Sequence, residues 1–104
     1  MALTPEAKVK RIVKQTLDEM DIYHFSPFQA GMGRAGIPDI IACHDGRFVA
    51  FECKAGNNKP TALQEKEIMA IQRAKGLAFV INEANMYDIK ELLQWNKHNQ
   101  SPKP

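Results

Sequence analysis

The stretch of sequence that decides the fold is Asp39-Ile-Ile-Ala-Cys-His44-Asp45-Gly46-Arg47-Phe-Val-Ala-Phe-Glu-Cys-Lys54. Two apolar runs, residues 39–44 and 47–54, flank the dipeptide Asp45-Gly46. An Asp-Gly pair between apolar runs is among the strongest short-range signals for a β-hairpin. Both runs are apolar at successive positions, which indicates strands covered on both faces. We therefore expect two central antiparallel strands in a sheet that is flanked by helices.

The predicted turn also fixes which residues of the hairpin face each other. If Asp45 and Gly46 are the two turn residues, Asp39 lies directly opposite Glu52, with Cβ atoms about 4.5–5.5 Å apart. Lys54 is two residues beyond Glu52 and shares its face of the sheet, whereas Cys53 points to the other face. Two facing carboxylates on an apolar sheet are destabilising unless a cation neutralises them. Lys54 does this in part, and a hard divalent cation such as Mg²⁺ or Mn²⁺ does it better.

A simpler interpretation gives the same residues a structural role and no catalytic one. Asp39 would cap a turn after Pro38, and Glu52 and Lys54 would form a salt bridge at a strand end. A functional site is favoured because three features coincide: the Pro-Asp start, the hairpin register, and charges within an otherwise apolar strand. Perturbed charges of this kind cluster at functional sites.

The rest of the chain supplies helices and one more strand. The order is helix, three strands, helix, strand and helix, with expected ranges 4–20, 23–30, 39–44, 47–54, 61–75, 77–81 and 85–97. Thr4, Thr61 and Asn85 are the expected helix caps, and Gly76 is the expected stop of the second helix. The strand at 77–81 follows a helix and should run parallel to its neighbour. This order predicts an α/β fold with a small mixed sheet in one domain, residues 1–100, followed by a frayed tail at 101–104.

The composition narrows the possible classes of function but does not identify one. The 104 residues carry a net charge of +2, which permits contact with a polyanion but does not predict it. Cys43 and Cys53 lie in apolar runs and are expected to be buried free thiols in a reducing compartment. No signal-peptide pattern and no apolar run of bilayer length is evident. We expect an intracellular, cytoplasmic protein (host cytoplasm if the source is viral) without membrane contact.

Three weaker signals have ordinary explanations beside the functional ones. Gly31 to Gly36 matches the G-x-G-x-x-G pattern, but Pro38 forbids the helix that a dinucleotide fingerprint must open. That loop is better interpreted as an entrance to the site, with Arg34 either a phosphate contact or a solvated side chain. A capping box accounts for Gln64 without any catalytic role, and the helix dipole accounts for Glu6.

Pro38-Asp39 followed by Glu52-Cys53-Lys54 resembles the PD-(D/E)XK nuclease superfamily. Within it, Gly36-Ile37-Pro38-Asp39, a leading helix that bears Glu6, and Gln64 at the start of the next helix are similar to the VRR-NUC group. The resemblance covers roughly residues 6–81 and implies a restriction-endonuclease-like αβββαβ core. It also implies a phosphodiester hydrolase, a Mg²⁺- or Mn²⁺-dependent DNA endonuclease selective for structures such as four-way junctions or flaps.

The resemblance further implies which residues form the site. Asp39, Glu52 and the main-chain carbonyl of Cys53 would bind the metal, and Glu6 would reach it directly or through a water. Lys54 would orient or help deprotonate the attacking water.

Gln64 would support that water or Lys54, and Arg34 and Lys59 are candidate DNA contacts. Junction resolution needs two symmetric cuts, so a homodimer is expected. The alternatives are a non-catalytic or accessory DNA-binding module on the same fold, and a nuclease acting on RNA or plain duplex.

Overall fold

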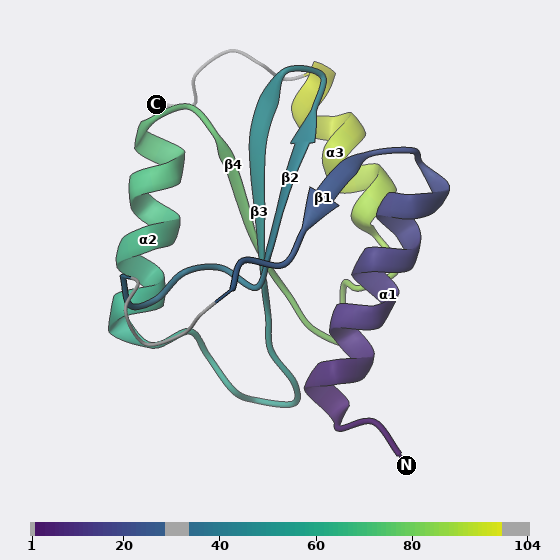
Figure 1. Cartoon of the computed structure of the whole chain (residues 1–104), viewed down its shortest axis with the longest axis vertical. Helices are drawn as coiled ribbons and strands as arrows, with labels where there is room; N and C mark the ends of the chain where they lie inside the picture. The colour runs from purple at the N-terminus through teal and green to yellow at the C-terminus, as the bar shows by residue number, and fades with distance from the viewer. Residues whose placement is uncertain (1, 29–33, 99–104) are drawn as a thin grey trace.

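The computed structural model describes residues 2–28 and 34–98. In this part of the chain the elements are α1 (Pro5–Glu19), β1 (Tyr23–Phe25), β2 (Ile40–His44), β3 (Arg47–Cys53), α2 (Ala62–Arg73), β4 (Leu77–Ile81) and α3 (Ile89–His98) (Figure 1). The strands form one sheet in the order β1-β2-β3-β4. β1, β2 and β3 are antiparallel neighbours, and β4 runs parallel to β3. The α/β fold with a small mixed sheet is confirmed.

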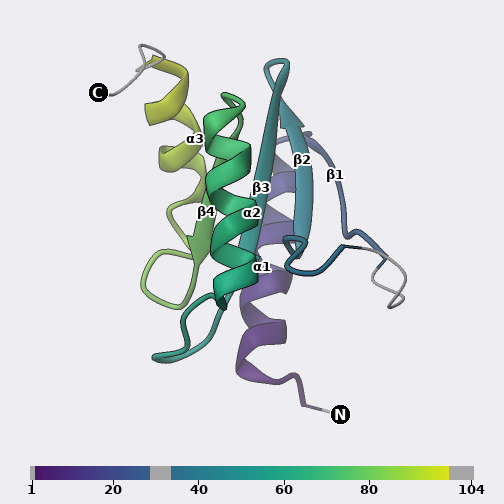
Figure 2. The same ribbon diagram turned by 90° about the vertical axis from the view of Figure 1, so that its left-hand side faces the viewer.

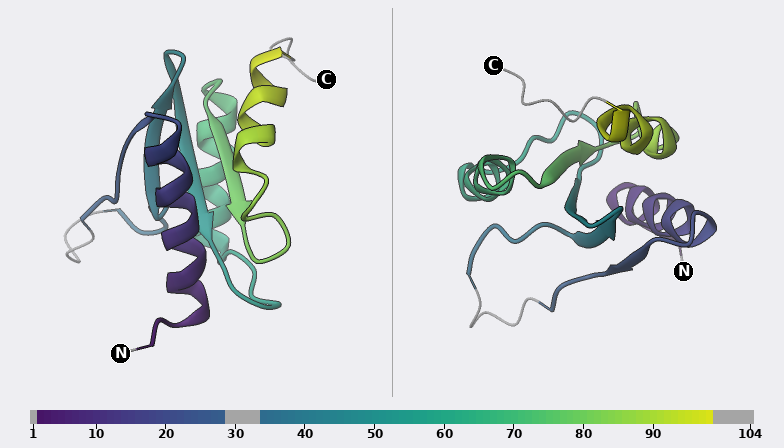
Figure 3. Two further views of the ribbon diagram at one scale, coloured as in Figure 1. Left: turned by 90° about the vertical axis from the view of Figure 1, so that its right-hand side faces the viewer. Right: turned by 90° about the horizontal axis from the view of Figure 1, so that it is seen from above.

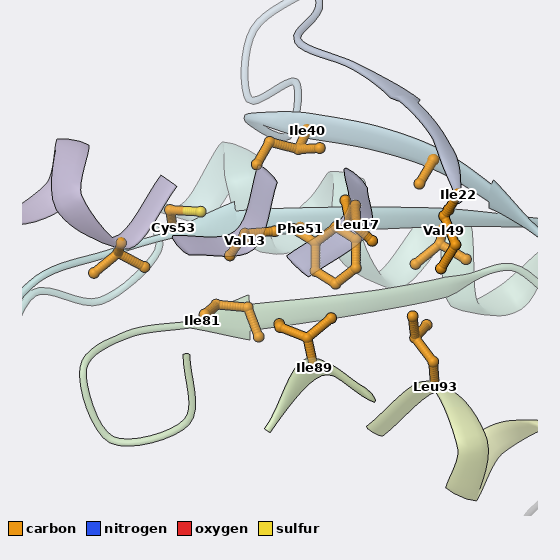
Figure 4. Packing of buried hydrophobic residues seen from close by; sticks show 12 residues of the cluster. Val13, Leu17, Ile22, Ile40, Val49, Phe51, Cys53, Ile81, Ile89 and Leu93 are labelled. Atoms are coloured by element: carbon orange, nitrogen blue, oxygen red, sulfur yellow. The ribbon is translucent and has the colours of Figure 1, made fainter. Parts of the chain in front are cut away.

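Helices cover the two faces of the sheet unequally. α2 lies alone on one face, where it packs against β4 and β3 (Figure 2). α1 and α3 lie side by side on the other face (Figure 3). The main core lies between these two helices and the sheet (Figure 4), and its fully buried members include Val13, Leu17, Phe51, Ile81 and Ile89. The β1–β2 half of the α2 face is consequently more open than the rest.

The central hairpin has the register that its turn predicts. His44 pairs with Arg47, and Ile40 pairs with Phe51. Asp45 has φ 52° and Gly46 has φ 79°, so both turn positions take the left-handed conformation that favours Asp-Gly in a two-residue hairpin. The next positions outward from Ile40 and Phe51 are Asp39 and Glu52, which therefore meet at the end of the hairpin opposite the turn.

The first strand is shorter than predicted. It was expected over residues 23–30 but ends at Phe25. Pro27 has no N–H to donate, so it cannot extend a ladder in which β1 pairs only with β2 in the described residues. Residues 29 and 30 lie outside the described residues.

The second helix ends at Arg73, two residues before the predicted end at Lys75. Thr61 caps it as predicted, but the left-handed residue at its end is Lys75, with φ 75°, and not Gly76. The Gly76 N–H donates to the Ile71 carbonyl at 2.9 Å. A Cβ on Gly76 would lie 2.8 Å from Ile71 Cγ2 and 3.1 Å from the Phe48 carbonyl oxygen. The glycine is therefore required for close packing of the helix end against β3.

Two expectations about single residues were wrong. Asn85 does not cap the last helix, which begins four residues later at Ile89. Its side chain instead accepts from the Asn82 N–H at 2.8 Å and donates to the Val80 carbonyl at 3.1 Å, and so closes the turn after β4. Cys43 is exposed because it lies on the open half of the α2 face, whereas Cys53 is buried as expected. No helix in the described residues is long and apolar enough to cross a membrane.

Candidate active site

The two acidic residues of the predicted motif meet where β2 begins and β3 ends. Asp39 immediately precedes β2, and its Oδ2 accepts a hydrogen bond of 2.8 Å from the Cys53 N–H. Glu52 lies within β3 and is only 2% exposed. It is the one charged residue in the buried set of the described chain. The sheet thus encloses a carboxylate that needs a compensating partner.

Glu52 receives that compensation on only one of its oxygens. Lys54 Nζ lies 3.4 Å from Glu52 Oε2, and Gln64 Nε2 donates to the same oxygen at 3.0 Å. Within the described residues, the other oxygen, Oε1, is buried and has no hydrogen-bond partner. Burial, followed by the repulsion of Asp39, raises the pKa of Glu52 to about 7 although Lys54 opposes the shift. The site is therefore short of positive charge at neutral pH.

Gln64 serves the helix and the site at the same time. The side-chain Oε1 of Gln64 accepts from the Thr61 backbone N–H at 2.9 Å. The backbone N–H of Gln64 donates to Thr61 Oγ1 at 3.2 Å, which completes the capping box. Its Nε2 remains available and binds Glu52. The capping explanation and the site explanation are thus compatible, because they use different atoms of one side chain.

Gly36 allows the loop before β2 to approach this helix start. It has φ +82°, and a Cβ there would lie 2.5 Å from the Leu63 carbonyl oxygen and 3.0 Å from the Gln64 backbone nitrogen. Any other residue would push the loop away from α2. The glycine therefore helps to position Pro38 and Asp39 relative to Gln64.

The first helix brings a residue that the sequence analysis missed. Lys10 Nζ lies 3.3 Å from Asp39 Oδ1 and 4.0 Å from Glu6 Oε2. Burial lowers the pKa of Lys10, but the attraction of Asp39 and of Glu6 outweighs it, so that the pKa is raised. Glu6 is linked to the carboxylate pair through Lys10. The spacing of four residues between Glu6 and Lys10 is the signal that could have placed both on one helix face.

The two candidate DNA contacts lie outside this cluster. Arg34 forms two hydrogen bonds with Glu67 on α2, at 3.0 and 3.2 Å. Its side chain is 71% exposed, so the guanidinium also faces solvent. Lys59 is exposed in the connection between β3 and α2. Glu83 holds that connection by accepting from the Gly56 N–H at 3.0 Å.

The donor set fits a hard divalent cation held by two carboxylates. In the described residues no group of three or more His, Cys, Asp or Glu side chains converges. Mg²⁺ commonly takes one or two carboxylates and completes its coordination with waters and substrate phosphate. Glu52 Oε1, buried beside Asp39 without a partner in the described chain, is an oxygen that such an ion would satisfy. Burial, followed by the charges of Asp39 and Glu52, raises the pKa of the Cys53 thiol to about 12.

The four-stranded mixed sheet flanked by helices is consistent with the restriction-endonuclease-like class of nucleases, and a carboxylate pair and a lysine lie where β2 begins and β3 ends. Residues 26–90 match the family of archaeal Holliday junction resolvases (Hjc). The chain belongs to this family, and it is accordingly a nuclease of the Holliday junction resolvase type. No curated protein matches the chain.

Proposed function

We propose that the protein is a divalent-metal-dependent endonuclease that cuts four-way DNA junctions at the site formed by Asp39, Glu52 and Lys54. The observation that carries the proposal is the buried, unpartnered Oε1 of Glu52 in the described chain, next to a second carboxylate. A buried carboxylate oxygen without a partner is costly, and a bound cation would remove that cost. Asp39, Glu52 and the Cys53 carbonyl would hold Mg²⁺ or Mn²⁺, and Glu6 would reach the ion directly or through a water.

The protein side chains divide the work at this site. When bound, the metal ion makes hydroxide accessible near neutral pH and neutralises charge on the phosphate in the transition state. Lys54, whose side chain is 13% exposed and whose Nζ lies 3.4 Å from Glu52 Oε2, orients the attacking water. Gln64 donates to Glu52 Oε2 and so leaves the opposite oxygen available to a cation. Arg34 and Lys59 contact the DNA backbone farther from the cut.

At a finer level, we propose that the chain is closer to the VRR-NUC group than the Hjc match alone implies. The Gly36–Asp39 motif and Gln64 support this. The backbone of Gly36 packs so closely against the start of α2 that no side chain fits there. We also propose that residues 1–100 form one domain. The four described strands form one sheet, with α2 packed on one face and the main core on the other, in agreement with this boundary.

Incubation with labelled DNA tests the function directly. We expect symmetric cuts in a four-way junction in the presence of Mg²⁺ or Mn²⁺, and no cutting in EDTA. Flap, nicked and plain duplex DNA and an RNA duplex serve as substrate controls. Equal turnover of all DNA substrates would remove the selectivity for junctions. Tight binding without any cut would favour the alternative of a non-catalytic DNA-binding module.

We further propose a homodimer, because two symmetric cuts require two sites related by a two-fold axis. Tyr23 and Phe25 on β1 are exposed on the open half of the α2 face, and Phe48 is exposed next to it on β3. Adjacent exposed apolar side chains mark interaction surfaces. We expect sedimentation to show a dimer at micromolar concentration, and Phe48→Ser to weaken it at least tenfold.

Trp95, exposed on α3, is the matched control, since α3 covers the opposite face of the sheet. Dissociation by Trp95→Ser but not by Phe48→Ser would place the interface on that other face. A parent protein that stays monomeric at the concentration at which it cuts junctions would rule out the dimer.

A further inference from the structure

Lys10 stands out because it occupies the oxygen that a metal ion needs. Of the four oxygens in the carboxylate pair, Asp39 Oδ2 accepts from the Cys53 N–H, and Glu52 Oε2 receives Gln64 and Lys54. In the described residues, Glu52 Oε1 has no hydrogen-bond partner. The remaining oxygen, Asp39 Oδ1, lies 3.3 Å from Lys10 Nζ. A cation bridging the two carboxylates through Oδ1 and Oε1 would therefore meet the lysine ammonium.

We propose that Lys10 is a positioning residue that neutralises Asp39 in the metal-free protein, gives way when the metal binds, and then contacts a DNA phosphate. This inference rests on the proposed metal-dependent nuclease function. It assigns to α1 a role that neither the hairpin motif nor the capping pattern contains.

The two lysines at the site differ in ways that suit them for different roles. Lys54 follows β3 directly, its N–H donates to the Ile81 carbonyl at 2.9 Å, and its side chain is 13% exposed. Lys10 lies on α1, which covers the face of the sheet opposite α2, and its side chain is 37% exposed. Its flexible four-carbon stem can move the ammonium without moving the helix. Lys10 is thus the cation that can leave.

The displacement follows from charge. A divalent ion at Asp39 Oδ1 would repel an ammonium in contact with the same oxygen. The carboxylate binds the divalent ion more strongly than it binds the ammonium. Glu6 Oε2, 4.0 Å from Lys10 Nζ, keeps the released ammonium close to the site. A phosphate that reaches the carboxylate pair carries the negative charge that replaces Asp39 as the lysine's partner. Metal binding and DNA contact are thereby coupled through one side chain.

Lys10→Met tests the proposal, because methionine keeps the length of the stem and removes the charge. Mn²⁺ affinity is measured by calorimetry without DNA, and junction cutting is measured at saturating Mn²⁺. We expect Mn²⁺ to bind about twofold to fivefold more tightly to the variant, since the partly exposed ion pair no longer competes. We expect cutting at low junction concentration to fall by about threefold to tenfold, with a shallower dependence on salt.

Controls separate this role from a structural one. Lys14→Met removes the same charge one turn farther along α1 and should leave both quantities within about twofold of the parent. Lys10→Arg keeps the charge and should cut at nearly the parent rate. A Lys10→Met variant that binds Mn²⁺ no more tightly than the parent would overturn the inference and leave the nuclease proposal intact. A parent protein that binds neither Mn²⁺ nor Mg²⁺ would overturn both.

Discussion

Asp39→Asn is expected to reduce junction cutting by about a thousandfold, which corresponds to roughly 4 kcal/mol of lost transition-state stabilisation. The asparagine oxygen can still accept from the Cys53 N–H, which Asp39 Oδ2 now does at 2.8 Å. Its amide NH₂ then takes the place of Oδ1, where a donor cannot bind a cation and also repels Lys10. The variant should therefore keep its fold and lose its metal. The measurements are the cutting rate in Mg²⁺ and the thermal shift caused by Mn²⁺.

Asp21→Asn is the matched control for this change. Asp21 follows α1 at the end away from Glu6 and is exposed with φ 55°, a conformation that asparagine tolerates well. The control also removes one negative charge, so an effect of net charge alone would appear in both variants. Undiminished cutting by Asp39→Asn would contradict the assignment of Asp39 as a metal ligand.

The hairpin was predictable because its chemistry is local. Asp45 and Gly46 are residues that accept positive φ, and a two-residue turn leaves only one register for the strands around it. The position of Asp39 opposite Glu52 follows from that register, as does the position of Lys54 on the same face. The parallel orientation of β4 follows from the intervening helix. These features need no knowledge of how the layers pack.

Features that depend on packing between distant segments were not predictable in the same way. Lys10 meets Asp39 only because α1 lies across the sheet, and a lysine on an amphipathic helix is ordinarily a solvated residue. Asn85 has two adequate local uses, a helix cap and a turn bridge, and the path of the chain after β4 selects the second. For this chain, local turn chemistry located the carboxylates and Lys54, while Lys10 required the tertiary structure.

Glu52→Gln is expected to stabilise the metal-free protein at alkaline pH while it abolishes cutting. The pKa of Glu52 is raised from 4.5 to about 7 by burial and by Asp39. Between these values the folded state holds a proton that the unfolded state has released, so the stability of the parent falls as the pH rises from 4.5 through 7. Above pH 7 the full cost of about 3 kcal/mol applies. Glutamine is neutral at every pH, can accept from Gln64 and Lys54, and avoids this cost.

Urea unfolding in EDTA at pH 4.5 and pH 8 measures the effect. The variant should match the parent near pH 4.5 and exceed it by up to about 3 kcal/mol at pH 8, whereas Glu19→Gln, at the exposed end of α1, should change little at either pH. Mn²⁺ should reverse the order at pH 8, because only the parent gains stability from the ion. Parent stability that rises between pH 5 and pH 8 relative to the variant would show that Glu52 is already compensated within the protein. The buried carboxylate would then be structural, and the principal reason for placing a metal ion there would be lost.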